Sequence, residues 1–293
     1  MGFYAGKSNP ILSFAIGIRY RYNRSEAVPG RRQTTMYLRK FAPRHPLLQS
    51  LVESYLILEM EEGRENRILP NSSIVFYFRY RGRIESVDPN GTKQLPASGI
   101  TGLFNTSRLI SYSPKTSNLL VTFRETGAAA FFRESLHEFF AKTVSLRDVF
   151  SESKIERIEE ELSESSSDEE RIQKIECFLL REWKKSEEDA LVQDAIRKIR
   201  KSSGEQKIKY LVAGLPVSVD VFEKRFRRVV GTSPKRYSSI VRMRHLIDTY
   251  SPSMNFTDLA YSSGYFDQAH FTKEFKAFTG LKPKEFFKNS KEW

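Results

Sequence analysis

The chain has 293 residues, of which 39% are hydrophobic and 13% aromatic, and its 48 Lys and Arg against 36 Asp and Glu give a formal net charge of +12. This length favours two domains, and the apolar content is enough to build folded cores, which excludes wholesale disorder. No apolar run reaches the roughly 18 residues of a membrane helix, and the one cysteine, Cys177, excludes an internal disulfide framework and a multi-cysteine zinc site.

The positive charge is concentrated at the two ends of the chain. The first 35 residues carry six basic residues and one acidic residue, and residues 191–293 carry 20 basic and 10 acidic residues. Residues 36–190 have a net charge of −3. A slightly acidic body therefore precedes a basic C-terminal third, which attracts anionic partners.

Residues 1–35 show no sustained hydrophobic period, and arginines rather than small residues follow their longest apolar run, Ile11–Ile18, which argues against a signal peptide. A different hydrophobic pattern, with apolar residues at helical spacing, begins at Met36. Two interpretations of the leader remain open: an over-extended reading frame before a natural start at Met36, or a native basic arm. Peptides from residues 1–35 in the mass spectrum of the native protein would exclude the first. We expect no membrane partner and a cytoplasmic location.

The sequence between residues 54 and 123 predicts strands. Tyr55–Glu59, Ser73–Tyr80 and Leu119–Phe123 are runs of β-branched and aromatic residues. Turn-prone clusters such as Asp88–Gly91 separate them. Short strands at this spacing are typical of a small antiparallel barrel or sandwich.

Helical patterns follow the strands. We expect helices over Ala128–Phe140, Lys154–Leu162 and Arg171–Lys184, with the acidic segment Ser163–Glu170 as a solvated loop or the start of a helix. Cys177 is assigned to the apolar stripe of the last of these helices, and hence to the core.

The C-terminal third contains an internal repeat with an offset of 49 residues. Phe222–Tyr237 and Phe271–Phe286 are identical at six of 16 positions, including two phenylalanines and a glycine followed three residues later by proline. The apolar residues of each copy fall on one face of a helix. Shorter helices are predicted before the copies, over Gln206–Ala213 and Phe256–Ser262, and Pro234–Tyr250 is long enough for a helix that joins the two units.

Helix boundaries can be predicted in both copies. Ser218 and Asp267 are suited to the N-cap position, and Gly231 and Gly280 stand where a left-handed C-cap is needed. Two short helices joined by a tight turn, the second with a basic free face, form a helix-turn-helix unit. Two such units held by one helix can meet successive major grooves on one face of DNA, which lie about 34–36 Å apart.

The second copy resembles the signature of the AraC/XylS family of bacterial transcription regulators. The residues that carry the resemblance are Leu259, Ala260, Gly264, Tyr265, Asp267, His270, Phe271, Phe275, Lys276, Gly280 and Pro283. The resemblance covers roughly residues 191–287 and implies a seven-helix DNA-binding domain with two helix-turn-helix units. It also implies binding to double-stranded promoter DNA, action on RNA polymerase, usually as an activator, and often a homodimer. The first copy matches less well, because Pro216, Val212 and Lys224 replace the usual glycine, alanine and arginine.

The resemblance also implies which side chains meet DNA. The base-facing positions are Asp220, Glu223 and Lys224 in the first copy, and Gln268, Ala269, His270, Thr272 and Lys273 in the second. The candidates for phosphate contacts are Arg227, Arg228, Lys235, Lys276 and Lys284. Gln268 suits adenine and Lys273 suits guanine, whereas carboxylates accept from cytosine and repel phosphate. His270 is equally well explained as a surface histidine without a base contact.

The body offers a weaker resemblance. Arg67–Asn71 before an apolar strand, together with Thr126-Gly127-Ala128, resembles an uncharacterised cupin-like N-terminal module of one branch of the family, with Asn71-Ser72 in place of the usual Asp-Gly. In the wider family such modules sense small molecules or dimerise. A small-molecule effector and a homodimer therefore both remain open.

The sequence thus predicts an α+β chain in three parts. Residues 1–35 form the basic leader, residues 36–187 a β-rich barrel or sandwich with C-terminal helices, and residues 188–293 an all-α double helix-turn-helix domain. An enzyme with a catalytic β-rich body is the alternative from another class, but no converging titratable groups are visible there. His45, His137 and His245 lack metal-ligand spacing, and no Gly-rich phosphate loop occurs. We therefore predict a sequence-specific DNA-binding regulator without catalytic residues, metal or cofactor.

Overall fold

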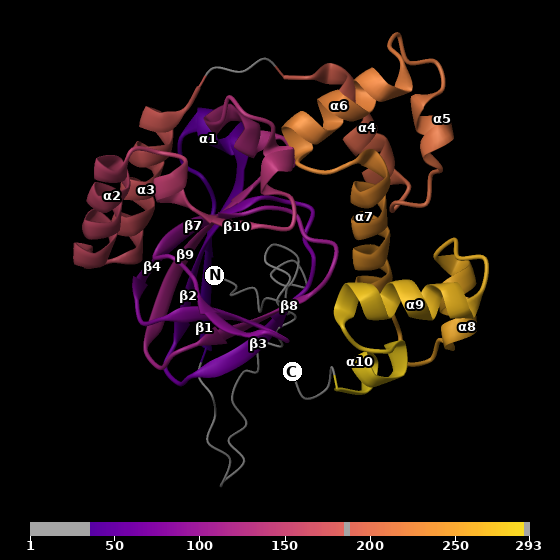
Figure 1. Cartoon of the computed structure of the whole chain (residues 1–293), viewed down its shortest axis with the longest axis horizontal. Coiled ribbons are helices and arrows are strands. Elements are labelled where there is room, and N and C mark those ends of the chain that lie inside the picture. The colour runs from indigo at the N-terminus through magenta and orange to yellow at the C-terminus, as the bar shows by residue number, and fades with distance from the viewer. Residues whose placement is uncertain (1–35, 185–187, 290–293) are drawn as a thin grey trace, which may run out of the picture.

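The computed structural model describes residues 36–184 and 188–289 (Figure 1). The chain is an α+β protein: a β-rich N-terminal part with flanking helices is followed by an all-α C-terminal part. This confirms the predicted fold class. The two interpretations of the basic leader concern residues that lie outside the described ones. No described helix is long and apolar enough to cross a membrane.

Two antiparallel sheets form the N-terminal part, with the strand orders β1-β2-β9-β4-β7-β10 and β3-β8-β5-β6. The strands of the first sheet are β1 (Met36–Phe41), β2 (Val52–Met60), β9 (Thr116–Phe123), β4 (Val75–Arg81), β7 (Ser98–Thr101) and β10 (Thr143–Ser145). The strands of the second sheet are β3 (Arg64–Ile68), β8 (Arg108–Tyr112), β5 (Ile84–Asp88) and β6 (Gly91–Gln94). The three strands predicted from the sequence correspond to β2, β4 and β9, which are neighbours in the first sheet.

Side chains of these central strands alternate between two apolar layers, because successive residues of a strand point to opposite faces. In β2, Leu56 and Leu58 pack with Ile110 and Tyr112 of the second sheet. The intervening Ile57 belongs to the larger core, which includes the helices. The first sheet is therefore covered by the second sheet on one face and by helices on the other.

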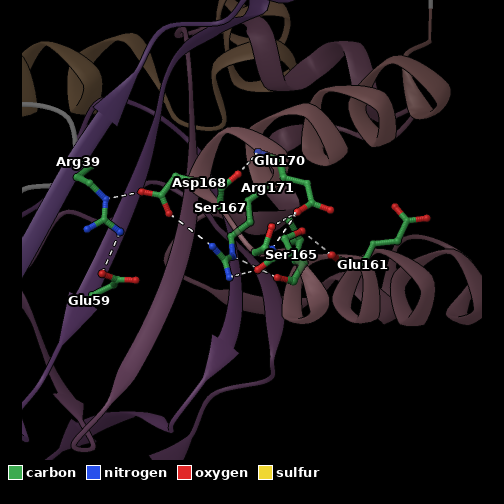
Figure 2. Close-up of polar contacts among 10 residues, drawn as sticks. Arg39, Glu59, Glu161, Ser165, Ser167, Asp168, Glu170 and Arg171 are labelled. Atoms are coloured by element: carbon green, nitrogen blue, oxygen red, sulfur yellow. Dashed lines mark hydrogen bonds and ion pairs between the residues drawn. The ribbon is translucent and has the colours of Figure 1, made fainter.

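Helices α2 (Glu152–Glu164) and α3 (Asp168–Glu182) form the hairpin that covers the outer face of the first sheet (Figure 1). Ser167 caps α3 by accepting a hydrogen bond from the Glu170 amide at 3.2 Å. Asp168 pairs with Arg39 of β1 and with Arg171, so the start of α3 is tied to the sheet edge (Figure 2). Only the last three residues of the acidic segment are the predicted helix start, because its first two residues end α2 and the next three connect the two helices.

Cys177 is exposed, so its assignment to the core was wrong. At about 100° per residue, a position five residues after the buried Ile172 lies roughly 140° around the helix, outside the apolar stripe. The neighbouring residue Glu176 is buried instead, and its carboxylate accepts a hydrogen bond from the Arg44 amide, between β1 and α1, at 2.7 Å.

The predicted helix over Ala128–Phe140 was also wrong. Two short 3-10 turns stand there, η2 (Gly127–Phe131) and η3 (Leu136–Phe139), and Phe132 between them is extended. Phe132 packs against Phe76 and Phe150 with ring centroids 5.9 Å apart in both pairs, and this tertiary contact outweighs the local helical pattern. Similarly, Met36–Phe41 is a strand, and only α1 (Pro46–Leu51) is helical in that region.

The C-terminal part consists of seven helices among the described residues (Figure 1). They are α4 (Ala190–Lys201), α5 (Ile208–Val212), α6 (Val219–Val230), α7 (Pro234–Thr249), α8 (Phe256–Ser262), α9 (Gln268–Thr279) and α10 (Pro283–Asn289). The repeated phenylalanines Phe222, Phe226, Phe271 and Phe275 are fully buried. Helix α7 joins the first unit, α5 and α6, to the second unit, α8 and α9.

The two parts of the chain touch through polar contacts as well as apolar packing. Gln193 of α4 donates to Thr126 Oγ1 at 2.8 Å, and Tyr237 of α7 donates to Glu125 at 3.3 Å. Arg244 of α7 donates from Nε to the carbonyl of Pro70 at 2.7 Å. The helical part is therefore anchored along α4 and α7.

Candidate nucleic-acid interface

The caps predicted from the sequence set the bounds of α6 and α9. Ser218 accepts a hydrogen bond from the Val221 amide at 3.4 Å, and Asp267 accepts one from the His270 amide at 2.7 Å. Gly231 and Gly280 end the two helices with φ of +90° and +81°, the left-handed region that favours glycine. The local chemistry of each copy therefore produces the same helix length in the fold.

Helix α9 presents its base-facing candidates outward. Gln268, Ala269, His270 and Lys273 are exposed and Thr272 is half-buried, while Phe271 and Phe275 hold the opposite face in the core. The Gln268 side-chain oxygen accepts from Thr257 of α8 at 3.1 Å, and the His270 ring nitrogen lies 3.6 Å from a Glu274 oxygen. Gln268 and Lys273 thus lie on an open face of the second unit.

Helix α6 presents a face of mixed charge. Asp220 and Lys224 are exposed, and Glu223 pairs with Arg227 at 2.6 Å across one helical turn. In this ion pair Glu223, which the sequence assigned to a base contact, binds Arg227, which the sequence assigned to a phosphate contact. The pair uses one nitrogen of Arg227 and one oxygen of Glu223, so the remaining donors of Arg227 are left for a phosphate.

The remaining phosphate candidates, Arg228, Lys235, Lys276 and Lys284, are exposed. Arg227 and Lys235 line a cleft together with three basic residues that the sequence reasoning missed: Lys207, Arg236 and Arg242. Arg236 corresponds in the repeat to the acidic Glu285, so comparison of the two copies gave no hint of it.

Other side chains fix the recognition helices in place. Arg225 of α6 donates to both carboxylate oxygens of Asp189 at 2.6 and 2.8 Å, before the start of α4. Glu274 of α9 accepts from Tyr265 at 2.8 Å and from Arg242 of α7 at 3.0 Å. Burial raises the pKa of the Tyr265 hydroxyl, which therefore stays a neutral donor. These contacts join α6 to the start of α4, and α9 to α7.

Apolar side chains also stand at the N-terminal ends of the recognition helices. Phe266, immediately before the α9 cap, is 89% exposed, and Val219 and Val221 of α6 are about half exposed. The sequence reasoning missed them, although an apolar residue that breaks the buried period of an amphipathic helix is a usable signal. Apolar side chains at such positions can contact the methyl group of thymine.

The region that carries both units matches a known domain family. Residues 211–289 match the family described as "Helix-turn-helix domain". The C-terminal part of the chain therefore carries an AraC-type helix-turn-helix domain. The chain is therefore a DNA-binding transcription regulator, as the resemblance of the second copy implied.

The N-terminal part of this AraC-type regulator matches a different family. Residues 39–145 match the family described as "Domain of unknown function (DUF6597)", which agrees with the predicted resemblance to an uncharacterised module. Within the described residues, no group of histidine, cysteine or carboxylate side chains is placed to hold a metal ion. No curated protein matches the chain in sequence.

Solved structures similar to the regulator include ToxT from Vibrio cholerae. The 1.65 Å structure of ToxT is 15% identical, with a TM-score of 0.40 over 79% of this chain and 96% of that one. ToxT bound to an unsaturated fatty acid is 12% identical, with a TM-score of 0.39 over 87% of this chain and 96% of that one. A Bacillus subtilis oxalate decarboxylase is 15% identical, with a TM-score of 0.23 over 32% of this chain and 26% of that one.

Proposed function

We propose that the chain reads two successive major grooves of one DNA duplex, with α6 and α9 as the recognition helices. The observation that carries this proposal is the presence of two capped helix-turn-helix units on one connecting helix, α7, each with its phenylalanines buried and its polar face outward. Gln268 and Lys273 supply base contacts in one groove, and Lys224 supplies one in the other. The exposed lysines and arginines around them neutralise phosphates.

The two units differ in the charge of their base-facing positions, and we expect them to contribute differently to DNA binding. Helix α9 offers Gln268 and Lys273 without a carboxylate at the neighbouring base-facing positions, whereas α6 offers Lys224 between Asp220 and Glu223. Carboxylates repel phosphate and reduce non-specific affinity. The second unit therefore contributes more of the binding free energy, and the first unit more of the discrimination at cytosine.

Selection from a random duplex library at roughly 0.15 M salt tests the proposal. We expect the enriched sequences to contain two half-sites about 10–10.5 base pairs apart, centre to centre. Inserting about five base pairs between them turns one half-site to the opposite face and should reduce affinity strongly. Enrichment of a single half-site, or equal affinity for every sequence, would contradict it.

The N-terminal part has a proposed role of its own: it senses a small molecule, because a cavity lies between its two sheets. We place this sensing domain at residues 36–187 and the DNA-binding domain at residues 188–293, and propose a cytoplasmic activator that acts on RNA polymerase at promoter DNA. A body that only forms a homodimer is the competing hypothesis. Light scattering of the full chain with and without a bound small molecule separates the two.

A further inference from the structure

A cavity of about 100 Å³ lies between the two sheets of the N-terminal part. Strands β4, β7 and β9 of the first sheet and β5 and β8 of the second contribute to its wall, and the segment from Ile68 to Asn71 closes one side. Most of the wall is aliphatic or aromatic. Arg108 of β8 is the one charged residue among the described residues that line it, and no carboxylate is among those residues.

Arg108 lacks an anionic partner within the part of the chain that the structure describes. Its guanidinium donates to the Thr143 hydroxyl at 3.2 Å and lies 4.0 Å from the centre of the Phe104 ring. Burial lowers its pKa to about 10, so the group still carries its charge at neutral pH. The Arg108 side chain is half-buried, and a carboxylate would supply the anionic partner that it lacks among the described residues.

Two further polar atoms of the cavity wall are unsatisfied. The Tyr77 hydroxyl and the Asn118 side-chain oxygen are buried and form no hydrogen bond with any described residue. Burial raises the pKa of Tyr77, which keeps its hydroxyl protonated as a donor. Buried polar atoms are nearly always paired, so these two atoms of the cavity wall are candidates for hydrogen bonds with a ligand.

Tyr77 is also held in position. A Cβ atom at Gly99 of β7 would lie 2.4 Å from the Tyr77 hydroxyl oxygen, so the glycine leaves the space that the hydroxyl occupies. The cavity therefore combines a fixed cation, a fixed neutral donor and an apolar wall. A ligand that satisfies it has one anionic group and an apolar body.

We propose that this cavity binds a small carboxylic acid as its carboxylate, with Arg108 as the counter-ion. Arginine pairs with carboxylates through two parallel hydrogen bonds. The volume is below the roughly 150 Å³ of an engineered apolar cavity that admits benzene, so a short-chain acid such as butyrate fits the cavity more readily than benzoate does. A doubly charged phosphate fits less well, because the wall supplies one cation. The inference rests on the proposed sensing role of the N-terminal part and adds the ligand's chemistry.

Calorimetric titration of the full chain with benzoate and butyrate, each compared with its neutral amide, tests the site without DNA. We expect at least one carboxylate to bind at least tenfold more tightly than its amide. Arg108→Met should remove that difference, and Arg108→Lys, which keeps the charge without the planar fork, should restore part of it. Arg83→Met, at an exposed arginine before β5, is the matched control and should bind like the natural chain.

Three outcomes would overturn the inference: acid and amide of both pairs binding equally, full carboxylate affinity in Arg108→Met, or tighter binding of inorganic phosphate. The affinity of the full chain for its selected DNA site is then measured with and without the carboxylate. A carboxylate that binds through Arg108 and leaves DNA affinity unchanged would support the site and refute the sensing role. The two proposals therefore fail separately.

Discussion

Two lysines on α9 differ in what they are expected to contact, although both are exposed and three residues apart. Lys273 is among the residues proposed to contact bases, and Lys276, about one turn further from the helix N-terminus, is proposed to contact phosphate. Base contacts specify sequence, whereas phosphate contacts only position the protein. The two side chains therefore provide a test of which part of DNA each one meets.

Lys273→Ala should weaken binding to the selected site by about 1–3 kcal/mol and relax the preference at one base position. Lys276→Ala should weaken binding equally for all sequences and reduce the slope of log K against log salt by about 1. Competition titrations at several salt concentrations, with the selected site and with single-base variants, measure both quantities. Identical profiles for the two variants would show that Lys273 contacts only phosphate.

For single residues, the sequence predicts which side chains are exposed better than it predicts which side chains they contact. The side chains proposed to meet DNA lie on the outer faces because helical periodicity alone sets which face is buried. The pairing of Glu223 with Arg227 was also accessible in principle, since four residues separate them. Arg108 was not accessible, because its contacts with Phe104 and Thr143 depend on how two sheets meet.

The success of prediction differs between elements for a physical reason. The bounds of α6 and α9 follow from caps and glycines within a few residues of each end, which is local chemistry. Strands such as β6 were missed because all four of its residues are exposed, so no alternation marks it. The segment Ala128–Phe140 was misassigned because aromatic packing from distant strands decided its conformation.

Gly127 at the start of η2 shows how tightly that segment is packed. A Cβ atom there would lie 1.9 Å from the carbonyl oxygen of Leu51, at the end of α1. Backbone cannot move aside as a flexible side chain does, so Gly127→Ala should lower the free energy of unfolding by about 1–3 kcal/mol or more, as overpacking does. Urea unfolding followed by circular dichroism measures it.

Gly63→Ala is the matched control for this prediction. A Cβ atom at Gly63 would lie 3.2 Å from a ring carbon of Pro114, which is a tight but tolerable contact. We expect its effect to stay below about 1 kcal/mol, within the range of ordinary substitutions. Equal destabilisation by the two variants would show that the close approach of η2 to α1 does not limit packing.

In the whole molecule, the cavity and the DNA-binding helices share one structural element. The segment that closes one side of the cavity includes Leu69 and Pro70, and their carbonyls accept hydrogen bonds from Arg244 of α7. Helix α7 joins the two helix-turn-helix units. We therefore expect a ligand that shifts the cavity wall to act on α7 through Arg244.

Arg244→Met should interrupt that route. Arg244 is buried, and burial lowers its pKa to about 10, which leaves it charged at neutral pH. Loss of its hydrogen bonds to two carbonyls should lower the free energy of unfolding by about 1.5–3 kcal/mol, the range for bonds to charged groups. Since the variant leaves Arg108 intact, it should bind the carboxylate normally, but the carboxylate should no longer change its affinity for DNA.

Calorimetry measures the binding of the carboxylate by Arg244→Met, and DNA titration measures the response of its DNA affinity. His245→Ala changes the exposed next residue of α7 and should behave like the natural chain. If Arg244→Met keeps the full response of DNA affinity to carboxylate, the signal does not pass through Pro70 and α7.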